Sequence, residues 1–202
     1  MKKITWGING AKLNAYLKSM KQMNMPVILH TVRDANDEPY VWLVSGFMGL
    51  KVPLCFYKEL IQPYTMTDAP EFGESKTVIG PERDGASLAS SAEDLVMKAE
   101  QVAYDTRFSV DIAKDKKWKS LSLFSLDDGT PVALNADYAG IFERGQYITY
   151  WGSGRYAPII IKGEYGITGI VMPVRLNEED VEKARAICQF FKAPERRGEQ
   201  AA

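Results

Sequence analysis

The sequence predicts an α+β fold in which one order of elements occurs twice. Residues 3–57 and residues 126–176 each contain a strand, a helix and three further strands in their pattern. Runs rich in β-branched and aromatic residues predict the strands, and apolar residues at helical spacing predict the helices. We therefore divide the chain into four parts: a first half-unit (1–57), an insert (58–125), a second half-unit (126–176), and a C-terminal helix with a polar tail (177–202).

The first half-unit is expected to contain one helix, which follows a strand at residues 3–9 and begins after Gly10. Its apolar face would be formed by four residues at helical spacing: Leu13, Tyr16, Leu17 and Met20. Lys12, Lys18 and Lys21 lie elsewhere on this helix, which carries no acidic residue. An ordinary solvated surface would explain these lysines, and a surface that meets phosphate groups is the alternative.

Three strands should complete the first half-unit, at residues 27–33, 40–47 and 50–57. Residues 58–90 alternate proline and glycine with small polar residues, a composition typical of a loop. The sequence Ser-Ser-Ala-Glu at 90–93 fits a capping box, so a helix is expected from there to Tyr104. Strands at 107–113 and 120–126 would end the insert.

A basic turn is expected between the last two strands of the insert. It contains Lys116, Lys117 and Lys119 around Trp118. Lysines beside an aromatic ring suit nucleic acid, because the lysines attract phosphate and the ring can stack on a base. A solvated turn is the alternative interpretation.

The second half-unit repeats the pattern, with a strand at 130–135, a helix at 136–143 and strands at 146–151, 156–162 and 165–176. Asn177 is a suitable N-cap for the last helix, and Glu178, Glu179 and Asp180 favour its first turn. One face of that helix carries five apolar residues: Val181, Ala184, Ile187, Cys188 and Phe191.

The residues give little support for catalysis. The one histidine, His30, lies on a predicted strand, and no metal-ligand spacing, phosphate loop or nucleophile elbow occurs. We expect no cofactor, although an enzyme with an unrecognised site remains an alternative. Cys55 and Cys188 are expected to be buried free thiols. A net charge of −1 and the absence of a long apolar run predict a cytoplasmic protein without a membrane partner.

The second half-unit resembles the closing half-domain of the bacterial DNA polymerase III β sliding clamp. Three motifs carry the resemblance, in the same order and with similar spacing: Leu134-Asn135-Ala136-Asp137-Tyr138, Ala157-Pro158-Ile159-Ile160 and Met172-Pro173-Val174-Arg175-Leu176. Residues 4–57 are similar to another clamp half-domain in element order only. The resemblance implies a clamp-like domain of two β-α-β-β-β half-units, with the insert and the C-terminal helix added.

By this resemblance, the protein is expected to be a homo-oligomeric DNA tether or docking subunit for replication proteins, from a phage or mobile element. The resemblance implies that Lys12, Lys18 and Lys21 meet duplex DNA on the inner wall of a ring. It also implies that Met172, Pro173, Val174, Arg175 and Leu176 border an apolar groove for a partner peptide. The alternatives are a regulator of the same fold that does not encircle DNA and, for the last five residues, a plain core and edge strand.

Overall fold

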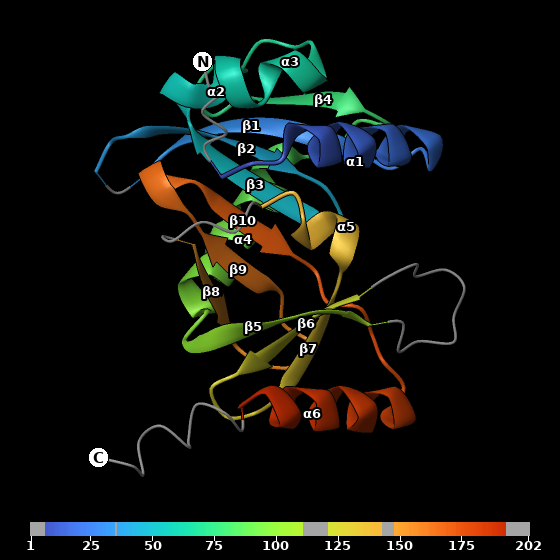
Figure 1. Ribbon diagram of the computed structural model, residues 1–202. Helices are drawn as coiled ribbons and strands as arrows, with labels where there is room; N and C mark the ends of the chain where they lie inside the picture. The colour runs from blue at the N-terminus through green and yellow to red at the C-terminus, as the bar shows by residue number, and fades with distance from the viewer. Residues whose placement is uncertain (1–6, 35, 111–120, 143–147, 193–202) are drawn as a thin grey trace, which may run out of the picture.

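The computed structural model describes residues 7–34, 36–110, 121–142 and 148–192, and its fold is α+β as predicted (Figure 1). Ten strands form one antiparallel sheet in the order β4-β1-β2-β3-β10-β9-β8-β5-β6-β7. In chain order the strands are β1 Val27–Arg33, β2 Pro39–Val44, β3 Met48–Pro53, β4 Ser75–Ile79, β5 Gln101–Val110, β6 Leu121–Leu126, β7 Pro131–Asn135, β8 Thr149–Gly152, β9 Ile159–Lys162 and β10 Thr168–Val171. The helices are α1 Gly10–Gln22, α2 Leu54–Leu60, α3 Gln62–Thr65, α4 Gly85–Lys98, α5 Ala136–Ala139, the 3₁₀ turn η1 Glu164–Gly166 and α6 Glu178–Lys192.

Two three-stranded meanders, β1-β2-β3 and β8-β9-β10, meet at the centre of the sheet. Their last strands pair antiparallel, with Leu50 opposite Gly169 and Gly49 opposite Ile170. Antiparallel pairing gives a local two-fold axis between β3 and β10, and a glycine and an aliphatic residue exchange places about it. The axis also relates the neighbouring strands β2 and β9, which pair with β3 and β10 in the same sense.

Helices cover both faces of this central sheet. On one face α1, α2 and α5 enclose the main core, which includes Leu13, Leu50 and Phe142. On the other face α4 packs through Ala89 and Ala92. Figure 1 shows α1 and α5 in front of the sheet and α4 behind it. The two half-units therefore share one core and place their helices on the same side.

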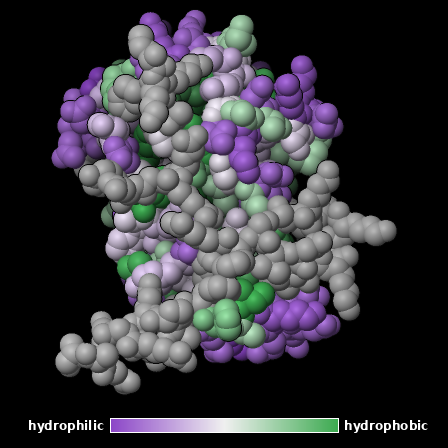
Figure 2. All heavy atoms as spheres, viewed as in Figure 1, coloured by the Kyte–Doolittle hydropathy of each residue, from purple (hydrophilic) through white to green (hydrophobic). Residues whose placement is uncertain are grey.

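The last helix closes a separate layer at the end of the sheet. α6 lies against β6 and β7 (Figure 1), and its Ala184 and Cys188 are buried there with Leu123 and Ala133. Its other side is charged, and Figure 2 shows the surface over α6 as largely hydrophilic. Asn177 caps the helix as predicted, since its Oδ1 accepts a hydrogen bond from the Asp180 N–H at 2.8 Å.

Several predicted element boundaries at the end of the first half-unit and in the insert are wrong. Residues 54–57 belong to α2 rather than to a strand, because the chain turns into a helix directly after Pro53. Residues 58–90 are not loop alone, since they contain α3, β4 and the first residues of α4. α4 begins at Gly85, where Asp84 accepts hydrogen bonds from the Ala86 and Ser87 N–H groups at 3.0 and 3.3 Å.

The end of the predicted helix at Tyr104 is also wrong. α4 ends at Lys98, and Gln101 begins β5, which pairs with both β8 and β6. The predicted strand at 107–113 is therefore the second part of β5 as far as Val110, and its last residues lie outside the described ranges. The predicted strand at 3–9 also lies mostly outside them, although Ile8 forms a bridge with Phe142.

The cysteine prediction is half right. Both thiols are free and Cys188 is buried, but Cys55 is exposed. Cys55 lies on the outward side of α2, whereas Tyr57 and Leu60 of that helix face the core.

Candidate nucleic-acid interface

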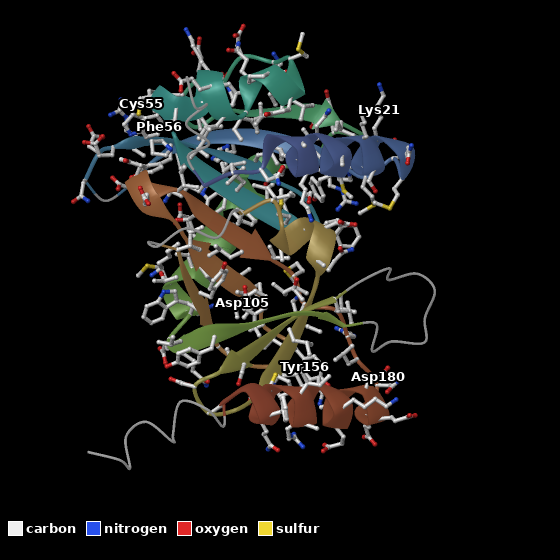
Figure 3. All side chains as sticks on the ribbon, in the orientation of Figure 1. Lys21, Cys55, Phe56, Asp105, Tyr156 and Asp180 are labelled. Carbon is white, nitrogen blue, oxygen red and sulfur yellow. The ribbon has the colours of Figure 1, made fainter. Side chains whose placement is uncertain are left out.

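The helix α1 presents its lysines away from a firmly packed apolar side. Its four buried residues are the predicted ones: Leu13, Tyr16, Leu17 and Met20. Asn9 caps the helix, since its side-chain oxygen accepts a hydrogen bond from the Lys12 N–H at 3.1 Å. Lys18 and Lys21 are exposed, and Lys12 is half-buried. Figure 3 shows Lys21 projecting from the last turn of the helix.

Lys12 is directed toward the second half-unit. Its Nζ lies 3.7 Å from Oδ1 of Asp137 on α5, with side-chain exposures of 41% and 74%. The same side chain lies over Gly140, because a Cβ added there would stand 2.5 Å from the Lys12 Nζ. An exposed pair of this kind contributes about 0–1 kcal/mol. Lys12 therefore shares its charge with a carboxylate, whereas Lys18 and Lys21 form no ion pair with any acidic residue that the structure describes.

Lys18 and Lys21 border a cavity of about 570 Å³ between α1, α3 and the end of β4. The cavity is also lined by Asn14 on α1 and by Tyr64 and Thr65 on α3. Two cations thus stand beside a recess that has both aromatic and polar walls. The sequence did not indicate this grouping, because residues 58–90 were predicted to be loop; the Gln62-Pro63 start of α3 was the signal available.

A buried aromatic group fixes α1 against α5 and the turn between β2 and β3. The Tyr16 and Ser45 hydroxyls form a short hydrogen bond, and the Tyr16 and Tyr138 rings meet edge to face at 5.0 Å. Burial raises the pKa of Tyr16 well above its usual value and outweighs the opposing effect of the Ser45 hydrogen bond. The orientation of the lysine-bearing helix is thus set by contacts that cross both half-units.

The other predicted DNA-binding residues cannot be placed relative to α1. Lys116, Lys117, Trp118 and Lys119 lie outside the described residues. The predicted interface therefore consists here of Lys18 and Lys21, with Lys12 beside Asp137.

The predicted partner-binding segment, residues 172–176, runs along the outer edge of β7. The Val174 N–H donates to the Ala133 carbonyl at 2.8 Å, and Pro173 forms a bridge with Leu134. Met172 is exposed, and its N–H donates to the Phe47 carbonyl at 3.0 Å. The segment thus covers the β7 edge and connects it to the turn between β2 and β3.

The C-terminal helix covers part of this segment. Val174 is buried with Ala184 and Cys188 of α6, and Leu176 packs against the same cluster. Arg175 is exposed. Any groove bordered by these five residues would therefore present Met172, Pro173 and Arg175, while α6 occupies the side of Val174 and Leu176.

The histidine lies in the core rather than beside a carboxylate. His30 is 5% exposed, and its Nδ1 is 2.9 Å from the Ser75 hydroxyl on β4. Across the described ranges, no group of three or more histidine, cysteine, aspartate or glutamate side chains is arranged to hold a metal ion.

Comparison of the chain with protein-family models, curated proteins and solved structures found no match. Of the helices within the described part of the chain, none combines the length and the apolar character needed to cross a bilayer.

Proposed function

We propose that the protein is a clamp-like subunit that tethers replication proteins to duplex DNA as a cytoplasmic processivity factor and acts as a homo-oligomer. The observation that supports this most strongly is the pairing of β3 with β10. It unites two meanders about a local two-fold axis. A domain of two equivalent halves, each contributing a helix to one face, is what the clamp resemblance implies.

The charge on α1 suits contact with a phosphate backbone. Lys18 and Lys21 are exposed one turn apart, and a rigid helix presents them to the same side. Lysines that meet phosphates supply affinity without reading sequence, and such binding weakens steeply with salt. This is the kind of contact that a tether moving along DNA requires.

Retention on closed circular DNA tests the tethering function. The protein should stay on a closed circle at moderate salt, leave when the circle is cut, and have a solution mass above that of one chain. The double variant Lys18→Glu/Lys21→Glu should lose this retention, and Lys12→Glu should lose less because Lys12 already lies beside Asp137. Lys58→Glu on α2 is the control for a single charge reversal, matched to Lys12→Glu.

Two results would overturn the proposal. One is a strict monomer at high concentration whose DNA binding does not depend on closure of the circle. The other is unchanged retention after both lysines on α1 are reversed.

A regulator that docks on replication proteins without encircling DNA is the second candidate. It is favoured by the position of α6, which covers Val174 and Leu176. It is also favoured by the Lys12–Asp137 pair, which reduces the positive charge between α1 and α5. In that case Met172→Ala and Arg175→Ala should weaken binding to the partner protein, while the lysine variants bind it normally.

A further inference from the structure

We propose that the cavity between α1, α3 and β4 binds one unpaired nucleotide, with its phosphate at Lys18 and Lys21 and its base against Tyr64 and the apolar wall. This site goes beyond the proposed tethering function, because it uses the interior of a recess and needs neither a ring nor a duplex. A free nucleoside phosphate and an unpaired nucleotide of a strand share this chemistry.

The recess has a suitable size and lining for a flat apolar group. Its volume of about 570 Å³ lies within the ~300–1,000 Å³ usual for small-molecule sites. Leu17 is buried, and Val78, Ile79 and Tyr64 are half-buried along its walls. Aromatic side chains bind bases of any sequence, since every base presents a π-face. Tyr64 is therefore the residue best suited to stack on the base.

Polar groups in the recess match the remaining parts of a nucleotide. Lys18 and Lys21 supply positive charge, and no aspartate or glutamate is among the described residues that line the cavity. Asn14 and Asn24 each bring an amide that can donate and accept hydrogen bonds, as the edge of a base requires. A phosphate and a base would thus both find partners of the right kind within one cavity.

The cavity lies near the C-terminal end of α1, where helix carbonyl groups repel anions if they are left free. Three of these carbonyls are engaged. The N–H groups of Met23, Asn24 and Met25 donate to Ser19, Lys21 and Met20, respectively, at 3.0, 3.2 and 3.0 Å. The two lysine side chains therefore dominate the charge at this end of the cavity.

Two backbone features shape the recess around its ligand. Gly80 has φ +76°, and a Cβ there would lie 2.9 Å from the Met25 carbonyl carbon, so the end of β4 approaches the chain after α1 closely. At the other side, a Cβ on Gly10 would collide with the Tyr64 hydroxyl. Gly80 thus allows β4 to approach the chain after α1 at one end of the cavity, and Gly10 allows the Tyr64 ring to lie against α1.

Calorimetric titration of the full chain tests the site with defined probes: the four ribonucleoside monophosphates, inorganic phosphate alone, a short oligothymidine strand and a short duplex. We expect saturable binding of at least one monophosphate and weaker binding of phosphate, whereas the duplex should compete with the nucleotide because both use Lys18 and Lys21. Stronger binding of the strand than of any monophosphate would identify a strand as the source. The reverse order would identify the free nucleotide.

One variant separates this site from the tethering function, and a second tests the phosphate contact. Asn14→Phe fills the recess and leaves both lysines in place, so it should abolish nucleotide binding while retention on circular DNA is unchanged. Lys21→Ala should weaken nucleotide binding by about tenfold, as expected for a lost charge-assisted contact, and Lys58→Ala should not change it. Circular dichroism and a thermal melt of each variant verify that it is folded.

The proposal is overturned if no monophosphate binds saturably at millimolar concentration, or if Asn14→Phe binds nucleotide as the parent does. Inorganic phosphate that binds as tightly as every monophosphate would also overturn it, because the recess would then recognise an anion alone. If the parent protein binds nucleotide but is not retained on circular DNA, the result contradicts the tethering function and supports the nucleotide site.

Discussion

The ammonium group of Lys51 on β3 lies 2.6 Å from a carboxylate oxygen of Glu93 on α4. The Trp42 indole N–H donates to the same oxygen at 2.9 Å, and the Lys51 Nζ lies 4.6 Å from the centre of the Tyr40 ring. The Lys51 side chain is only 12% exposed, so its charge has little access to water. This group of side chains attaches α4 to the central strands of the sheet.

Replacing Glu93 should therefore loosen α4. We expect Glu93→Ala to lower the free energy of unfolding by about 2 kcal/mol. This is more than a surface ion pair and less than a fully buried one, because Glu93 is 38% exposed. Glu93→Gln keeps an acceptor for Trp42 and should cost about half as much. Urea unfolding measures both, with the exposed neighbour Asp94→Ala as control; equal effects of Glu93→Ala and Asp94→Ala would contradict the assignment.

Gly169 on β10 is expected to tolerate no side chain while Phe142 is present. An added Cβ would collide with the ring of Phe142. The Phe142 side chain is itself buried, with 4% of its surface exposed. Gly169→Ala should cost about 1–3 kcal/mol through overpacking. In a Phe142→Leu background the same change should cost less than half as much. A double-mutant cycle in urea measures this coupling, and additive effects would show that the ring does not set the limit.

Stability should fall at alkaline pH through Tyr16. Burial raises the pKa of Tyr16 above 10.0, so in the folded protein this hydroxyl keeps its proton after the unfolded chain has released it. Since the unfolded state then binds fewer protons, the free energy of unfolding decreases as pH rises above about 10. The stabilisation is fully present below that pH.

The variant Tyr16→Phe tests this dependence. At neutral pH it should cost about 1 kcal/mol for the lost hydrogen bond to Ser45. Between pH 9 and 11 its stability should fall less steeply than that of the parent. Tyr57 and Tyr138, whose pKa values burial also raises, should preserve part of the slope. The exposed Tyr156→Phe is the control, and parallel curves for parent and Tyr16→Phe would contradict the prediction.

The two thiols should differ sharply in reactivity. Cys55 is exposed on α2, whereas Cys188 is 1% exposed on the side of α6 that packs on the sheet. A thiol reagent in excess should modify one equivalent quickly and a second only when the chain opens. Cys55→Ser should remove the fast phase, and Cys188→Ser should remove the slow one. Two fast equivalents in the parent would mean that α6 does not stay on β6 and β7.

Local sequence signals were sufficient to locate the strands of the two meanders and the helices α1 and α6. α1, β6, β7 and α6 were predicted where they lie because each shows a clear period or cap, such as the Asn177 cap of α6. The insert was harder, because the pattern contains no stop signal between α4 and β5. Ala99 and Glu100 have no glycine or proline beside them, and only pairing with β8 and β6 makes the next residues a strand.

The candidate site was predicted only in part, because it also depends on contacts between segments that are far apart in the sequence. The lysines of α1 are visible as a one-sided charge pattern, but their neighbours come from α3 and β4, about 40 to 60 residues later in the chain. The Lys12–Asp137 contact joins residues from two half-units, so no local pattern indicates it. Burial of Val174 under α6 likewise depends on how the last helix folds back.

The two outer strands of the sheet differ in a way that limits assembly. At β7 the backbone is occupied by Pro173 and Val174, whereas β4 at the opposite end pairs within the sheet only with β1. Among the described strands, β4 is the one at which a second molecule can extend the sheet, and Lys76 there discourages indiscriminate pairing. If two molecules paired symmetrically through β4, both of these edges would be occupied, so growth by strand addition would stop at a dimer. An assembly of higher order must use another surface for its second contact.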